Sequence, residues 1–131
     1  IIVIILLAVL FVVRKIIKLL GNYGTVLTEH IGDKTLSVMG EDGQTDNYIY
    51  DRDMAWLNAA DVVVAEVTTP SLGVGYEIGK ADGLKPLLCL YREQDGKRIS
   101  AMLSGNQRIT IEKYKTIDDL KPILERFFKK I

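Results

Sequence analysis

Residues 61–67 restrict the fold more than any other part of the chain. Their sequence, DVVVAEV, places valine at positions that point to both sides of a β-strand. A strand that is apolar on both faces is typical of a parallel sheet covered by helices on each side. Helical patterns flank this strand, over residues 46–60 before it and roughly 73–83 after it. We therefore expect right-handed βαβ units and an α/β fold.

The remaining segments continue the alternation. Further strands are predicted within 1–13 and at 25–30, 85–92 and 107–114, and further helices after residue 13, at 96–105 and at 116–131. Asp46 is the predicted N-cap of the helix at 46–60, and Thr116 that of the last helix. Five strands in 131 residues predict one domain, residues 1–131, with a flavodoxin-like or Rossmann-like three-layer sandwich and a five-stranded parallel sheet. Ligands of such folds bind beyond the carboxyl ends of the strands, where the strand order reverses.

The N-terminal segment is atypical. Residues 1–13, IIVIILLAVLFVV, are apolar without interruption, and no turn residue separates them from the basic helix that begins with Arg14. A membrane span needs about 20 apolar residues, and no signal-peptide cleavage pattern follows. We expect a buried strand rather than a membrane segment. We also expect this segment to be truncated or altered relative to the natural gene, and we assign no site residue within it.

Charge and composition exclude several classes of function. The chain carries 17 basic and 17 acidic residues, so no basic excess favours nucleic-acid binding, and any phosphate site must be local. Cys89 is the single cysteine and His30 the single histidine, which predicts neither a disulfide nor a zinc site, and we expect no cofactor. Cys89 lies in an apolar run and is expected in the core, in a protein of a reducing compartment such as the cytoplasm (or the nucleus, in a eukaryote). His30 is expected to be a structural residue at a strand end.

The segment after the valine-rich strand, TTPSLGVGYEIGKA (68–81), is the strongest candidate for a site. The chain is expected to turn through Pro70, Gly73 and Gly75, and glycines there allow the backbone to approach a ligand. Ser71 can cap the new helix or donate to a phosphate. Glu77 is either a residue that matches the helix dipole or a catalytic carboxylate, and spacing alone leaves both open. The glycine spacing fits neither a dinucleotide fingerprint nor a P-loop.

A second carboxylate lies on the preceding helix, in YDRDMAWL. On its own, Asp53 is best interpreted as a solvated helix charge. That helix nevertheless leads to the same sheet edge, so Asp53 and Glu77 can converge. Two carboxylates with different roles are the usual arrangement for cleaving a glycosidic bond.

Several motifs together resemble one enzyme family. These are YGTVLTEH, DRDMAWLNAADVVVAEVTTPSLGVGYEIGKA, KPLLCLYRE and RISAM, within residues 23–103. They resemble the 2′-deoxynucleoside 5′-phosphate N-hydrolases of the nucleoside 2-deoxyribosyltransferase superfamily. The resemblance implies hydrolysis of a deoxynucleoside monophosphate to free base and 2-deoxyribose 5-phosphate.

The same resemblance implies roles for individual residues. Glu77 would be the nucleophile that forms a glycosyl-enzyme ester, and Asp53 the second carboxylate, which orients the sugar and assists proton transfer. Ser71 would bind the phosphate. Ser100 would reach the phosphate, and Met102 the base, of a neighbouring subunit's site in a homodimer. Tyr76 and Trp56 are expected to be core or wall residues.

The match fails at one place. The family has a loop with glycine, serine and arginine after its first strand, and this loop wraps the 5′-phosphate; the corresponding residues here are apolar. Three alternatives therefore remain open. They are a transferase that moves deoxyribose between bases, a non-catalytic nucleotide-binding paralogue, and, with the least support, a flavodoxin-like electron carrier.

Overall fold

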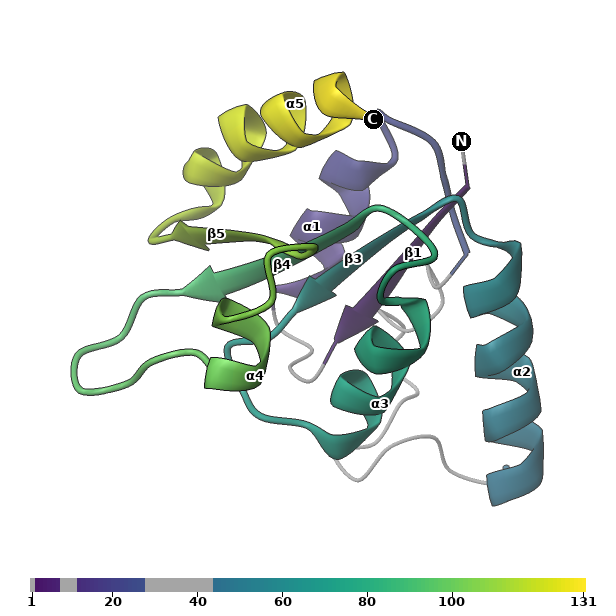
Figure 1. Cartoon of the computed structure of the whole chain (residues 1–131). Helices are drawn as coiled ribbons and strands as arrows, with labels where there is room; N and C mark the ends of the chain where they lie inside the picture. The colour runs from purple at the N-terminus through teal and green to yellow at the C-terminus, as the bar shows by residue number, and fades with distance from the viewer. Residues whose placement is uncertain (1, 8–11, 28–43) are drawn as a thin grey trace.

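A single parallel sheet organises the molecule, for which a computed structural model describes residues 2–7, 12–27 and 44–131 (Figure 1). The strands are β1 (Ile2–Leu7), β2 (Thr25–Val26), β3 (Val62–Glu66), β4 (Leu87–Arg92) and β5 (Thr110–Tyr114). Their order is β2-β1-β3-β4-β5, and every pair of neighbours is parallel. This order confirms the predicted flavodoxin-like fold, and it reverses between β1 and β3.

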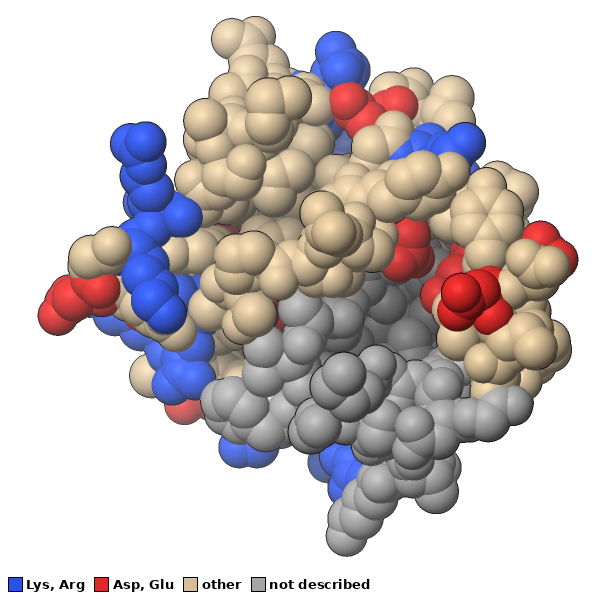
Figure 2. All heavy atoms as spheres, turned by 90° about the horizontal axis from the view of Figure 1, so that it is seen from below, with Lys and Arg blue, Asp and Glu red and all other residues tan. Residues whose placement is uncertain are grey.

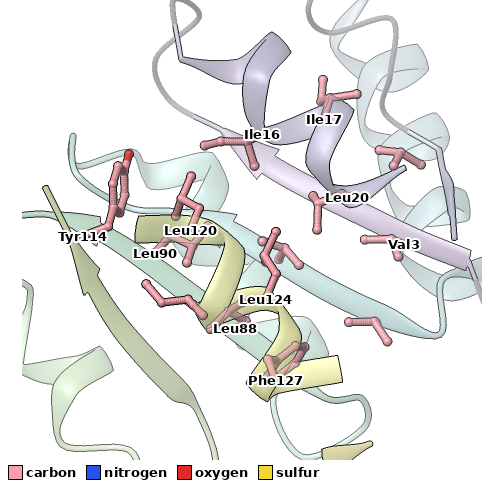
Figure 3. Close-up of a cluster of buried hydrophobic side chains, with 14 of the residues drawn as sticks. Val3, Ile16, Ile17, Leu20, Leu88, Leu90, Tyr114, Leu120, Leu124 and Phe127 are labelled. Atoms are coloured by element: carbon pink, nitrogen blue, oxygen red, sulfur yellow. The ribbon is translucent and has the colours of Figure 1, made fainter. Parts of the chain in front are cut away.

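Helices cover both faces of the sheet. They are α1 (Val13–Leu20), α2 (Asp46–Ala59), α3 (Leu72–Ala81), α4 (Ala101–Ser104) and α5 (Leu120–Lys130), with a 3₁₀ turn at Ile117–Asp119. Helices α1 and α5 pack on one face, where leucine, isoleucine and phenylalanine side chains meet the strands (Figure 3). Helices α2 and α3 pack on the other face.

The central strand β3 explains why two cores form. All five of its residues are buried, and they alternate between the two faces. Val62 and Val64 contribute to the α1–α5 core, whereas Val63 and Ala65 contribute to the α2–α3 core. Cys89 is fully buried in the second core, as predicted, and burial raises the pKa of its thiol to about 12. The two-sided burial inferred from DVVVAEV is thus confirmed.

The N-terminal segment forms the predicted buried strand and basic helix. Residue Val3 in β1 is fully buried, and Arg14, Lys15 and Lys18 lie exposed on α1. Helix α1 ends at Leu20, and Gly21 is its C-cap. Among the described residues, no helix is long and apolar enough to cross a membrane. His30 and the link between β1 and α1 lie outside the described residues.

The predicted boundaries of helices α2 and α4 were wrong. The N-cap of α2 is Thr45, whose hydroxyl accepts the Tyr48 N–H at 3.1 Å, and Asp46 lies in the first turn instead. Helix α4 spans Ala101–Ser104 rather than 96–105, because Gly96 has a φ of +72° and the helix starts only at its cap, Ser100. The strand predicted at 25–30 pairs with β1 through Thr25–Val26, and the Leu27 N–H also donates to the Val3 carbonyl at 2.9 Å; its remaining residues lie outside the described part of the chain.

A buried carboxylate joins the carboxyl ends of three strands. Glu66, at the end of β3, is 4% exposed. It accepts the Thr68 N–H at 2.7 Å, the Thr68 hydroxyl at 2.9 Å and the Tyr114 hydroxyl. The Thr68 hydroxyl in turn accepts the Arg92 N–H at 2.8 Å. The segment that leaves β3 is therefore tied to the ends of β4 and β5.

Replacing Tyr114 by phenylalanine tests this network. The change keeps the ring but removes a donor from a buried carboxylate, so the free energy of unfolding should fall by about 2 kcal/mol. Urea denaturation measures the change. Tyr23→Phe is the matched control, because Tyr23 stacks on Phe128 at 4.5 Å and its ring is kept; a shift below about 0.5 kcal/mol is expected there. Equal effects of the two substitutions would contradict the role of Glu66.

Candidate active site

The segment that follows β3 delivers a helix to the edge of the sheet where the strand order reverses. Ser71 is the N-cap of α3, and its Oγ accepts the Val74 N–H at 3.3 Å. Gly73 and Gly75 lie inside the helix, and neither has a positive φ. The predicted turn through the glycines was therefore wrong, because residues 67–71 make the bend. A Cβ on Gly75 would meet nothing within 4 Å, so this face of the helix is open.

A cavity of about 240 Å³ lies between α2 and α3. Its walls combine carboxylates with apolar and aromatic groups; the lining residues are Asp46, Ile49, Tyr50, Asp53, Met54, Gly73, Tyr76 and Glu77. Figure 2 views the molecule from the end where α2 and α3 begin; several acidic groups lie on the right, the side of α2, and basic groups are most numerous on the left, where an acidic group also lies. We call this cavity the Glu77 pocket.

The structure brings Asp53 and Glu77 into this one pocket. The side chain of Asp53 is 25% exposed, so the interpretation of Asp53 as a solvated helix charge was wrong. The pKa of Glu77 is raised to about 7: burial and the negative charge of Asp53 raise it, and the positive charge of Arg52 lowers it. Two carboxylates with different electrostatic environments thus share one cavity.

The ionisation of Glu77 differs from that of an ordinary glutamate. A solvated glutamate is fully ionised at neutral pH, whereas a pKa of about 7 leaves Glu77 about half protonated there. Helix α3 begins at Leu72, so Glu77 lies beyond the first turn, where the favourable effect of the helix dipole has faded. Burial therefore dominates over the dipole.

Arg52 is a site residue that the sequence analysis missed. Its Nε and Nη2 both donate to Oδ1 of Asp53, at 2.9 and 2.7 Å. Its guanidinium lies 4.6 Å from the ring centroid of Trp56 and 5.8 Å from that of Tyr48. Aromatic, arginine and aromatic residues at positions 48, 52 and 56 fall on one helix face, and this spacing was the available signal.

Two tyrosines from different helices meet at the edge of the Glu77 pocket. The hydroxyls of Tyr50 on α2 and Tyr76 on α3 are 3.3 Å apart, and both rings are about half exposed. This hydrogen bond raises the pKa of Tyr50 and lowers that of Tyr76. Tyr76 is thus a wall residue, one of the two expectations for it, and Trp56 packs against the α2–α3 core.

Ser100 and Met102 lie apart from the Glu77 pocket within one chain. Ser100 caps α4 by accepting the Met102 N–H at 3.2 Å, and the Met102 side chain is 84% exposed. Met102 lines a different cavity of about 530 Å³, between α3 and α4. Within the residues that the structure describes, no cluster of three or more histidine, cysteine, aspartate or glutamate side chains could hold a metal ion.

Residues 11–120 match the family model described as nucleoside 2-deoxyribosyltransferase. The chain belongs to this family. Within the deoxyribosyltransferase family, similar curated proteins include the 5-hydroxymethyl-dUMP N-hydrolases of Esox lucius and Homo sapiens. The Esox lucius protein is 47% identical, over 88% of this chain and 83% of its own length. The Homo sapiens protein is 43% identical, over 88% of this chain and 69% of its own length. These matches confirm the resemblance seen in the sequence motifs.

The deoxyribosyltransferase-family fold is also found among solved structures. The CMP N-glycosidase of Clostridium botulinum superposes with a TM-score of 0.66 over 95% of this chain and 98% of that protein, at 16% sequence identity. At that identity the likeness concerns the fold. The Glu77 pocket lies beside the start of α3, at the carboxyl end of β3, where ligands bind in folds of this type.

Proposed function

We propose that this chain hydrolyses the N-glycosidic bond of 2′-deoxynucleoside 5′-monophosphates, giving free base and 2-deoxyribose 5-phosphate. The convergence of Asp53 and Glu77 in one pocket carries the proposal. Two carboxylates in different environments are what cleavage through a cationic, oxocarbenium-like sugar requires. The activity named for the curated relatives points in the same direction.

In the first step, the ionised carboxylate of Glu77 attacks C1′ of the sugar. The C1′–N bond breaks, its electron pair leaves with the base, and Asp53 assists the transfer of a proton to that base. In the second step, Asp53 assists removal of a proton from water, whose oxygen attacks C1′ and releases Glu77 from the ester. A deoxyribosyl cation forms readily because it lacks a 2′-hydroxyl, so a nearby anion supplies enough stabilisation.

The phosphate is proposed to lie at the start of α3. Ser71 is the cap of that helix; Gly73 lines the Glu77 pocket, and Gly75 lines the neighbouring cavity between α3 and α4. We propose that Ser100 and Met102 act in the pocket of a second copy of the chain, in a homodimer. Their exposure on α4 supports this arrangement. The buried thiol of Cys89 suits the reducing cytoplasm as the compartment.

Release of free base from a panel of deoxynucleoside 5′-monophosphates tests the proposal directly. Chromatography should show base and 2-deoxyribose 5-phosphate in equal amounts. The family also contains transferases, so a second free base should be added in a parallel reaction. Appearance of that base as a new nucleotide would favour the transferase. Binding of a monophosphate without any release of base would favour a non-catalytic protein.

The pH dependence provides a further prediction. Only ionised Glu77 can attack C1′, and its ionised fraction grows as the pH rises through about 7. We expect kcat/KM to rise between about pH 6 and pH 8 and then to level off. Asp53→Asn removes a charge that raises the pKa of Glu77, so the midpoint of the residual activity should move to lower pH. A flat profile from pH 5.5 to 8.5 would contradict the assignment of Glu77, since the ionised fraction of a group with a pKa near 7 changes many-fold over that interval.

A further inference from the structure

The arginine beside the two carboxylates is held unusually firmly for a long side chain. Its side chain is 17% exposed, and its guanidinium stacks closely on Trp56, which itself packs against the α2–α3 core. A guanidinium that is fixed in one plane loses less entropy for each hydrogen bond that it makes. The guanidinium of Arg52 can therefore fix the orientation of a group that it hydrogen-bonds.

Arg52 donates two hydrogen bonds to one oxygen of Asp53. Nε and Nη2 both donate to Oδ1, and no donor from the described residues reaches Oδ2. One oxygen is thus fixed, and the other keeps its full capacity to accept or transfer a proton. This division suits a carboxylate that is expected to assist proton transfer in both steps of the reaction.

Arg52 also changes the charge balance of the Glu77 pocket. The described acidic groups of the pocket are Asp46, Asp53 and Glu77. Lys80 on α3 lies 5.5 Å from the ring centroid of Tyr76, at the rim. On the other elements near α3, Glu66 is bonded to Thr68 and Tyr114, and Asp82 is paired with Arg108 at 2.7 Å. Among the described residues, Arg52 is the cation that lowers the pKa of Glu77.

We propose that Arg52 is a positioning residue of this site, which fixes the Asp53 carboxylate through Oδ1 and supplies the positive charge that allows Asp53 and Glu77 to share one pocket. The inference rests on the proposed hydrolysis for its kinetic part only. Its electrostatic part concerns the substrate-free protein and can be measured without any substrate.

Three variants separate charge from geometry. Arg52→Gln removes both, and Arg52→Lys keeps the charge but loses the planar pair of N–H donors. Arg126→Gln is the matched control, because it breaks another arginine–carboxylate pair, with Glu112 at 3.6 Å, on helix α5. The midpoint of Glu77 ionisation is measured by carboxyl ¹³C NMR, kcat and KM by base release from a deoxynucleoside monophosphate, and folding by thermal denaturation.

In Arg52→Gln, the Glu77 midpoint should rise by about one pH unit. The acid limb of the rate profile should move by the same amount, and kcat should fall at least about tenfold with little change in KM. Arg52→Lys should restore the midpoint but only part of kcat, and Arg126→Gln should change neither. An unchanged Glu77 midpoint in folded Arg52→Gln would overturn the proposal, even with reduced stability, because the role would then be structural. If the parent protein releases no base, the proposed function fails, while the NMR midpoint still decides the role of Arg52.

Discussion

Replacing Glu77 by glutamine should reduce the release of free base by at least about 10⁴-fold, because glutamine cannot form the ester with C1′. The Glu77 carboxyl is largely buried between α2 and α3. The other carboxylates among the described residues of the pocket are Asp46 and Asp53. Glutamine has nearly the same shape, and the loss should therefore be chemical rather than structural. Single-turnover assays with excess enzyme measure the remaining rate.

Stability measurements supply the control for this variant. The pKa of Glu77 in the folded protein, about 7, lies above its ordinary value of 4.5, so the folded state binds more protons than the unfolded state between these values. The contribution of Glu77 to stability is therefore present below pH 4.5 and is lost as the pH rises to about 7. Glutamine carries no charge, so Glu77→Gln should be as stable as the parent at pH 5 and more stable at pH 8. Activity within about tenfold of the parent, in a variant that shows this gain in stability, would exclude Glu77 as the nucleophile.

Replacing Asp53 by asparagine should lower kcat by about 10²- to 10⁴-fold, the usual size of a general acid–base contribution. Asparagine keeps the size of the side chain and can still accept from Arg52, so the pocket should remain intact. The loss should be smaller than for Glu77, because the nucleophile remains and water can carry protons slowly. Steady-state kinetics with a natural deoxynucleoside monophosphate measure the effect.

The choice of leaving group sharpens this test. A nucleotide with a base that is already cationic, such as 7-methylguanine, leaves without gaining a proton. Asp53→Asn should therefore recover most of the rate of base release with that substrate, whereas Glu77→Gln should recover none. Asp51→Asn, an exposed aspartate on the same helix, should stay within about twofold of the parent. Equal losses with both substrates would show that Asp53 acts on the sugar and not on the base.

The fold was accessible from sequence because burial on both faces leaves a distinct pattern. The run of valines at 62–64 can be accommodated only in a central strand, and the helical periods on each side then determine the layers. Boundaries were less accessible. Thr45 and Asp46 are adjacent residues that both cap helices well, and the choice between them depends on the path of the chain before α2.

The candidate site was accessible only in part. The topology brings the first part of α2 and the start of α3 to one edge of the sheet, so the convergence of Asp53 and Glu77 followed from the order of elements. The raised pKa of Glu77 could not be predicted from the order of elements, because it depends on how much water the packed helices exclude. Arg52 was missed for a similar reason, since its importance arises from stacking on Trp56 and not from its charge alone.

One uninterrupted stretch of chain, from α2 through β3 to α3, supplies both carboxylates, the arginine and the helix cap. The distance between the two carboxylates is therefore set by how α2 and α3 pack beside β3. The other segments contribute no residue to this pair. A lineage can exchange or lengthen the segments beyond this stretch, and thereby alter which molecule is admitted, while the bond-breaking groups keep their mutual geometry. The bond-breaking residues can therefore be retained together during evolution, while the residues that select the substrate change.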